Sequence, residues 1–204
     1  LKISKYLNKK YSIPNLCLAG GVALNCVANS KILSQGNFKK VWIQPASGDA
    51  GGSLGAALAF WHKELNKPRK INLNDSMKGS YLGPSFNANE IEKELNKVGA
   101  DFIKLDEKSI IELTAKELSN GKAIGWFQGR MEFGPRALGS RSIIADPRSE
   151  TMQKTLNLKV KYRESFRPFA PSILYEDLEE WFDLNCPSPY MLLVANISEK
   201  KSIK

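Results

Sequence analysis

Two arginine-rich segments in the second half of the sequence carry the side chains best suited to chemistry. The first, residues 129–146, reads GRMEFGPRALGSRSIIAD, and its three arginines are interleaved with glycines. The second, residues 159–172, reads KVKYRESFRPFAPS. A guanidinium group can bind phosphate or carboxylate oxygens with two parallel hydrogen bonds, and glycines let a ligand approach the backbone closely. Together the two segments predict a site for an anionic, phosphorylated compound.

The spacing of cations in the second segment suggests how they act together. If residues 161–167 are extended, Lys161, Arg163 and Arg167 point to one side of the strand. Like charges on one face repel each other, so an anionic ligand would relieve the repulsion. A structural alternative stays open for the first segment, in which Arg136 or Arg141 anchors a nearby acid or loop carbonyls.

The first half of the sequence has two loops made almost wholly of small residues. Residues 19–25 read AGGVALN and residues 47–57 read SGDAGGSLGAA. Backbone N–H groups at the start of a helix can bind phosphate, although paired glycines are also common in tight turns. Asp49 is the only carboxylate of the second loop, and it is suited either to capping a helix or to binding a metal ion.

The elements that must position these residues follow from hydrophobic periodicity and from glycine and proline breaks. In the first half we predict strands at residues 15–19 and 41–44, and helices at 22–33 and 54–65. Residues 66–80 are polar and rich in lysine, which predicts a linker. In the second half we predict helices at 89–98, 109–120 and 177–182, and strands at 102–105, 122–127 and 191–197. The alternation of strands and helices predicts an α/β fold.

The composition of the chain excludes fewer classes of protein than its motifs do. The chain has 204 residues, a net charge of +9 and three cysteines without metal-ligand spacing. Neither a membrane helix nor a secretory signal is apparent, so we expect a cytoplasmic protein. Scattered lysines indicate a solvated surface, whereas the clustering of six arginines between Arg130 and Arg167 indicates a site.

Four stretches resemble carbamoyltransferases of the nodulation-protein-U and cephamycin-carbamoylation (NodU/CmcH) type: AGGVALN, PASGDAGGSLGAALA, GRMEFGPRALGSRSI and RESFRPFAPS. The resemblance spans residues 15–196. It implies that residues 1–66 are the C-terminal part of an actin-like carbamoyl-transfer domain, that 67–80 are a linker, and that 81–204 are a YrdC-like domain that forms carbamoyl adenylate. It also implies that the chain is a truncated, C-terminal piece of a longer enzyme.

The resemblance further implies roles for individual residues. Arg136, Lys161 and Arg167 would grip carbamoyl phosphate and the phosphates of ATP as catalytic residues. Supporting contacts to the ligands would come from Arg130, Arg141, Arg163 and Ser172, and the nucleotide would lie against Gly20, Gly21 and Asn25. Asp49 would hold a divalent metal, iron or magnesium, together with two upstream histidines. The single histidine of this sequence, His62, follows the motif, and we expect it to be a surface or packing residue.

The predicted function is ATP-dependent O-carbamoyl transfer from carbamoyl phosphate, by way of carbamoyl adenylate, to a hydroxyl-bearing small molecule. The partners expected are therefore small molecules, with no membrane and no nucleic acid, and a homodimer is left open. Two alternatives are an RNA-binding module of a tRNA-modifying enzyme and an actin-like ATPase or kinase. The RNA-binding alternative lacks exposed aromatics among the cations, since we expect Trp126, Phe127 and Phe169 to be core residues.

Overall fold

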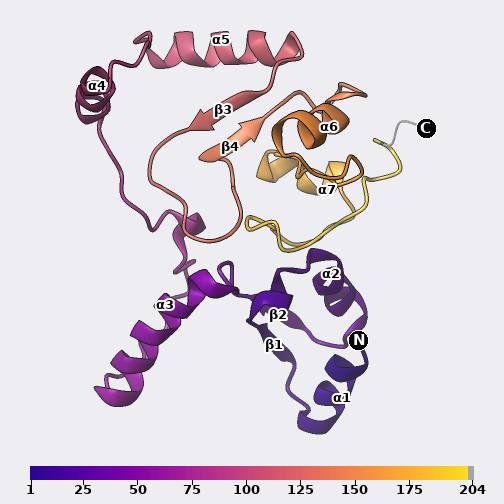
Figure 1. The fold of residues 1–204 in the computed structure, drawn as a ribbon. Helices are drawn as coiled ribbons and strands as arrows, with labels where there is room; N and C mark the ends of the chain where they lie inside the picture. The colour runs from indigo at the N-terminus through magenta and orange to yellow at the C-terminus, as the bar shows by residue number, and fades with distance from the viewer. Residues whose placement is uncertain (202–204) are drawn as a thin grey trace. The chain divides into compact units, whose positions relative to one another are not determined.

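Two α/β units, each assembled from separate stretches of sequence, make up the computed structural model, which describes residues 1–201 (Figure 1). Unit 1 consists of Leu1–Leu82, Glu132–Leu138 and the C-terminal stretch from Ile173, and unit 2 consists of Gly83–Met131 and Gly139–Ser172. The α/β class predicted from the sequence is confirmed. The correspondence of these units to an actin-like and a YrdC-like domain stays a prediction.

Unit 1 begins with helix α1 (Lys2–Tyr11) and a small parallel sheet of β1 (Asn15–Leu18) and β2 (Lys40–Ile43) (Figure 1). The connection between the strands passes through the helical turn η1 (Gly21–Leu24) and helix α2 (Cys26–Gln35). This is the crossover that parallel strands require. Side chains alternate between exposed and half-buried along both strands, as expected for a sheet with one covered face. Both strands were predicted from the sequence.

Two helices of unit 1 differ from their predicted bounds. The helix predicted at 22–33 is divided at Asn25, whose backbone is extended and whose side-chain Oδ1 accepts a hydrogen bond from the Ala28 N–H at 3.0 Å. An asparagine in this position caps a new helix. The helix predicted at 54–65 begins earlier, as α3 (Asp49–Ala59), and ends in the π-helical turn η2 (Phe60–Glu64).

The rest of unit 1 is largely irregular. It contains the turn η3 (Lys78–Ser80), the turn η5 (Tyr175–Asp177) and the short helix α7 (Leu178–Trp181). The strand predicted at 191–197 is wrong, because among residues 1–201 this stretch forms a single isolated bridge, from Ile197 to Phe182. Side chains of α2 take the place of a strand partner. Asn29 Nδ2 donates to the Leu192 carbonyl at 3.1 Å, and the Ser30 hydroxyl accepts from the Val194 N–H at 2.8 Å.

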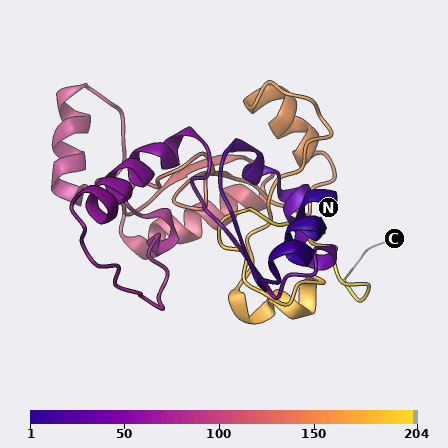
Figure 2. The same ribbon diagram turned by 90° about the horizontal axis from the view of Figure 1, so that it is seen from below.

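Unit 2 contains helices α4 (Ala88–Lys97) and α5 (Glu107–Ser119) and an antiparallel pair of strands, β3 (Ile124–Phe127) and β4 (Arg141–Ile144). A helical segment follows, formed by α6 (Met152–Thr155) and the π-helical turn η4 (Leu156–Val160). Helix α5 lies along the strand pair, as Figures 1 and 2 show. The two predicted helices are confirmed. The strand predicted at 102–105 is wrong, because within the described residues this stretch pairs with no other strand and simply connects α4 to α5.

Apolar burial is limited in both units. Within the described part of the chain the buried apolar side chains are Ala23, Ala46, Met77, Met152, Leu156 and Leu192. Several large side chains, including Trp42 and Phe127, are more than half exposed. Phe127 was predicted to be a core residue, and its 60% exposure at the end of β3 corrects that prediction. In the part of the chain that the structure describes, no helix is both long and apolar enough to cross a membrane.

Candidate functional site

The first glycine-rich loop of unit 1 turns sharply between β1 and η1. Gly20 has φ +93°, a backbone conformation that strongly favours glycine, and a side chain there would meet no atom within 4 Å. Gly20 and Gly21 are therefore open to solvent, and the first amides of η1 have no partner within the turn. Asn25, predicted to contact a nucleotide, uses its Oδ1 to cap α2 and retains its amide N–H groups for other contacts. The nucleotide contacts of these three residues stay predictions.

The second loop leads into α3 and places Asp49 at the first position of the helix. Gly48 precedes it as the cap residue, and the Asp49 carboxylate is exposed and makes no capping hydrogen bond. The capping role weighed for Asp49 is therefore wrong. Among residues 1–201 no three histidine, cysteine or acidic side chains gather as metal ligands. His62 lies in η2, half-buried, with its Nδ1 in contact with the Lys67 carbonyl at 2.9 Å, which agrees with the expected packing role.

Arg136 belongs to unit 1, although most of its sequence neighbours lie in unit 2. Its Nη2 donates to the Leu24 carbonyl oxygen at 2.9 Å, so it meets the turn η1 directly. The loop that carries it is fixed at both ends. Phe133 N–H donates to the Ser80 carbonyl at 2.7 Å, and the buried Glu132 carboxylate accepts from the Leu138 N–H at 2.9 Å. Arg136 thus anchors a loop carbonyl, as the structural alternative predicted, through one of its N–H groups.

Two polar atoms of unit 1 are buried without a hydrogen-bond partner among the described residues: the Arg136 Nε and the Ser47 Oγ. Both lie on loops that meet, because Gly134 and Ala46 approach so closely that a Cβ on Gly134 would lie 3.4 Å from the Ala46 Cβ. Buried polar groups are nearly always paired in folded proteins. An unpaired donor and hydroxyl here are consistent with a bound ligand.

The predicted extended segment 161–167 of unit 2 is instead a tight turn. Lys161 closes η4, with its N–H donating to the Leu156 carbonyl at 2.9 Å, and Tyr162 has φ 49°. The Arg163 N–H then donates to the Asn157 carbonyl at 2.9 Å. The expectation that three cations line one face of a strand is therefore wrong. The backbone turns because Asn157 provides hydrogen bonds that a strand partner would otherwise provide.

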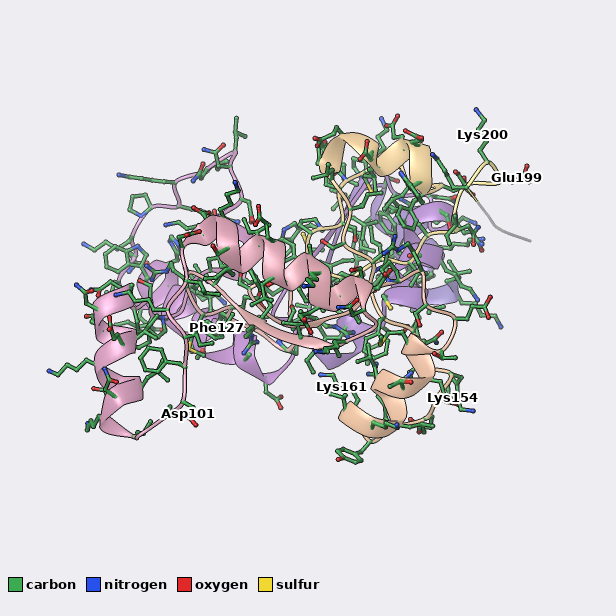
Figure 3. All side chains as sticks on the ribbon, turned by 90° about the horizontal axis from the view of Figure 1, so that it is seen from above. Asp101, Phe127, Lys154, Lys161, Glu199 and Lys200 are labelled. Atoms are coloured by element: carbon green, nitrogen blue, oxygen red, sulfur yellow. The ribbon has the colours of Figure 1, made fainter. Side chains whose placement is uncertain are left out.

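The three cations of this turn have different surroundings. Arg163 Nε donates to the Asn157 Oδ1 at 2.6 Å, and its guanidinium lies over the Phe169 ring, 4.8 Å from the ring centre. Arg167 forms an ion pair with Glu164 at 2.8 Å. The pKa of Glu164 is lowered by hydrogen bonding to its own backbone and by the charge of Arg167. Lys161 is exposed, has no partner among the described residues, and follows the helical segment that carries Lys154 (Figure 3).

The remaining arginines of the cluster are also distinguishable. Arg148 is bound to Asp146 through its Nε and Nη2, with Nη2 at 2.6 Å from Oδ2, and hydrogen bonds from its side chain and backbone lower the pKa of Asp146 to about 2. This guanidinium is therefore engaged. Arg130 is exposed and unpaired within residues 1–201, whereas Arg141 begins β4 opposite Phe127 and is half-buried. Ser172 is exposed at the end of unit 2.

The sequence did not single out Asn157, which is fully buried and contacts the backbone of Ser165 and Arg167 as well as the Arg163 side chain. A signal was present, since an asparagine between Leu156 and Leu158 is a polar residue in an apolar helical stretch. Buried asparagines of this kind are retained when every hydrogen bond is satisfied.

Two family models match the chain. The model described as carbamoyltransferase N-terminus matches residues 1–58, and the model described as carbamoyltransferase C-terminus matches residues 115–204. The first covers the glycine-rich loops of unit 1, and the second covers both arginine-rich segments. The matched regions thus contain every residue to which a role was assigned.

Curated relatives match nearly the whole chain. An uncharacterized protein of Synechocystis sp. is 54% identical over 202 residues, which is 98% of this chain and 33% of that protein. Nodulation protein NolO of Bradyrhizobium diazoefficiens is 43% identical over 201 residues, covering 97% of this chain and 36% of the relative. Nodulation protein U of Sinorhizobium fredii is 39% identical over 178 residues, covering 87% and 29%. The chain spans about a third of the length of these relatives.

Proposed function

Because this chain belongs to the carbamoyltransferase family, we propose that it is part of an ATP-dependent enzyme that transfers a carbamoyl group to the hydroxyl of a small molecule. In this proposal unit 2 takes part in forming carbamoyl adenylate and unit 1 in passing the carbamoyl group to the acceptor. Unit 2 would then correspond to a YrdC-like domain and unit 1 to part of an actin-like domain.

The proposed reaction has two stages. Carbamoyl phosphate first gives carbamate and phosphate by reaction with water, and a carbamate oxygen attacks the α-phosphorus of ATP, so that carbamoyl adenylate forms and pyrophosphate leaves. The acceptor hydroxyl then attacks the carbamoyl carbon, loses its proton, and displaces AMP. The first stage brings several anionic phosphates together, which clustered guanidinium and ammonium groups would stabilise as charge develops.

The observation that supports the proposal most is the state of Arg163. Its guanidinium is held by a neutral side chain and an aromatic ring and forms no ion pair within the described residues. The carboxylate next to it in sequence, that of Glu164, is ion-paired to Arg167; its pKa is lowered by hydrogen bonding to its own backbone, by the charge of Arg167 and, less, by the charge of Arg163. Lys161, two residues before it, is exposed and unpaired over the same range. Two cations that are two residues apart and form no ion pair within the described residues suit a phosphorylated ligand.

In unit 1 the proposal gives the open glycine loop and Arg136 to the carbamoyl-transfer stage. The unpaired Nε of Arg136 and the unpaired hydroxyl of Ser47 are buried beside the loops that follow β1 and β2. A carbonyl or phosphate oxygen would satisfy both groups. Asp49 stays one proposed ligand of a divalent metal ion, which takes four or more ligands; among residues 1–201 no group of three histidine, cysteine or acidic side chains gathers around it.

The test uses the protein expressed from its complete reading frame. Release of pyrophosphate should require both ATP and carbamoyl phosphate, and Lys161→Ala should lower the rate about a hundredfold, as for removal of one charge-stabilising group. Lys154→Ala is the matched control, because Lys154 is an exposed lysine on α6 of the same segment and should leave the rate unchanged (Figure 3). Pyrophosphate release without carbamoyl phosphate would contradict the proposal.

A further inference from the structure

The side chain of Asn157, in unit 2, is engaged through both its amide oxygen and its amide nitrogen. It is fully buried in η4, and its Oδ1 accepts the hydrogen bond from Arg163 Nε at 2.6 Å. Its Nδ2 donates to the Ser165 carbonyl at 3.1 Å and to the Arg167 carbonyl at 2.8 Å. These partners fix which way the amide points, because Arg163 Nε can only donate and the two carbonyls can only accept. One side chain thus sets both the turn and the orientation of a guanidinium.

The Arg163 guanidinium has little freedom left. Its Nε is bound to Asn157 and its plane lies over the Phe169 ring, 4.8 Å from the centre, while its two terminal nitrogens make no hydrogen bond within the described residues. A shallow groove lies beside it, lined by Leu158, Tyr162, Arg163 and Glu164. A guanidinium that is already oriented loses less entropy when it binds an oxyanion than a mobile one does.

The chemical type of the residue at position 157 matters as much as its placement. An aspartate would also accept from Arg163, but it would cancel the positive charge and could not donate to the Ser165 and Arg167 carbonyls. An asparagine satisfies all three groups and leaves the charge of Arg163 available.

We propose that Asn157 is a positioning residue, which orients the Arg163 guanidinium so that its terminal N–H groups bind a phosphate or pyrophosphate oxygen of the substrate. The identity of that substrate rests on the proposed function. The positioning of Arg163 by Asn157 does not, and binding of any compound with a polyphosphate group can test it.

The experiment is a double-mutant cycle on the protein expressed from its complete reading frame. Dissociation constants for inorganic pyrophosphate are measured by calorimetry for the native protein, Asn157→Ala, Arg163→Ala and the double variant. Each single variant should bind about tenfold more weakly, as expected for loss of a charge-assisted hydrogen bond. The double variant should be no weaker than Arg163→Ala, because Asn157 acts through Arg163. Additive losses would overturn the proposal.

Gln153→Ala is the matched control. Gln153 Nε2 donates to the Arg167 carbonyl at 3.1 Å, so this variant loosens the same turn without touching Arg163. It should lower the melting temperature while changing pyrophosphate affinity less than twofold; a loss as large as that of Asn157→Ala would mean that Asn157 only supports the turn. If Asn157→Ala does not fold, Asn157→Asp replaces it, and native-like affinity in that variant would count against the proposal.

Failure of the proposed function can be told apart from failure of this inference. If the Asn157→Ala and Arg163→Ala losses of pyrophosphate affinity are not additive but the native protein does not turn over carbamoyl phosphate, Asn157 is still a positioning residue and the proposed reaction is refuted. If the native protein turns over carbamoyl phosphate but the two losses are additive, the proposed reaction stands and the role of Asn157 is refuted. A folded native protein that neither binds pyrophosphate nor turns over carbamoyl phosphate would refute both.

Discussion

The Arg136 side chain donates from Nη2 to the carbonyl oxygen of Leu24 at 2.9 Å, across 112 residues of sequence. This contact ties an arginine of the GPRALG stretch to the turn that follows the first glycine-rich loop. Arg136 lies in unit 1, whereas Lys161 and Arg167 lie in unit 2. The first test of Arg136 is therefore its contribution to the stability of unit 1.

Replacing Arg136 should destabilise unit 1. Arg136→Ala leaves the half-buried Leu24 carbonyl without its partner, which costs about 1 kcal/mol of the free energy of unfolding. Denaturant unfolding of the variant measures this loss. Arg130→Ala is the control, because Arg130 is exposed and unpaired within residues 1–201, and its change should stay within about 0.5 kcal/mol. Equal stability of the two variants would show that the Leu24 contact is not formed.

Asp75 and Tyr190 are hydrogen-bonded to each other, and we expect the free energy of unfolding to fall at both low and high pH because each of them titrates there. Burial raises the pKa of Asp75, but hydrogen bonds from the Tyr190 hydroxyl and from the Gly79 and Met77 N–H groups outweigh it, so the net pKa is lowered from 3.8. Stability from Asp75 is therefore present above its unfolded pKa and is lost as pH falls through the lower folded value.

The alkaline side follows from Tyr190. Burial and the hydrogen bond to Asp75 raise its pKa to about 12, so its contribution is present below its ordinary pKa of 10.0 and is lost as pH rises towards 12. The free energy of unfolding, measured against pH, should fall in both ranges. Tyr190→Phe should abolish the alkaline fall attributable to this residue. An unchanged alkaline profile in that variant would refute the assignment.

Arg148 should be dispensable for binding of phosphorylated ligands. Its guanidinium holds Asp146, and hydrogen bonds from it keep the pKa of that carboxyl at about 2. In Arg148→Ala the pKa of Asp146 should rise towards 3.8, which an NMR titration of the carboxyl carbon would detect. Pyrophosphate affinity should remain native in this variant. A tenfold weaker affinity would place Arg148 in the binding site instead.

Local patterns allowed much of the fold to be predicted from the sequence. Strands β1 and β2, helices α4 and α5 and the α/β class follow from hydrophobic periodicity and from glycine and proline breaks. The capping residues Asn87 and Asp106, which the structure shows at the starts of α4 and α5, are equally local signals. The single helix predicted at 22–33 is wrong at Asn25, because this side chain caps a new helix within an apolar run that by itself favours one continuous helix. The pairing of Arg148 with Asp146 is equally local and could have been anticipated.

Non-local contacts set the limit of the sequence-based predictions. The alternation of Lys161, Arg163 and Arg167 fits a strand, but the hydrogen bonds of Asn157 turn the chain, and their geometry depends on burial that the sequence does not display. The attachment of Arg136 to Leu24 joins segments that no periodic pattern connects. Family resemblance identified the arginine-rich segments; the structure shows which of their side chains are already engaged.

The central claim is that Lys161 and Arg163 of unit 2 bind the phosphates of an adenylate-forming reaction. Exchange of labelled pyrophosphate into ATP, dependent on carbamoyl phosphate, measures that reaction directly in the protein from the complete reading frame. The account predicts exchange in the native protein, native-like exchange in Lys154→Ala, and loss of about a hundredfold in Lys161→Ala and in Arg163→Ala. Undiminished exchange in both of the latter variants, or no exchange in the folded native protein, would contradict it.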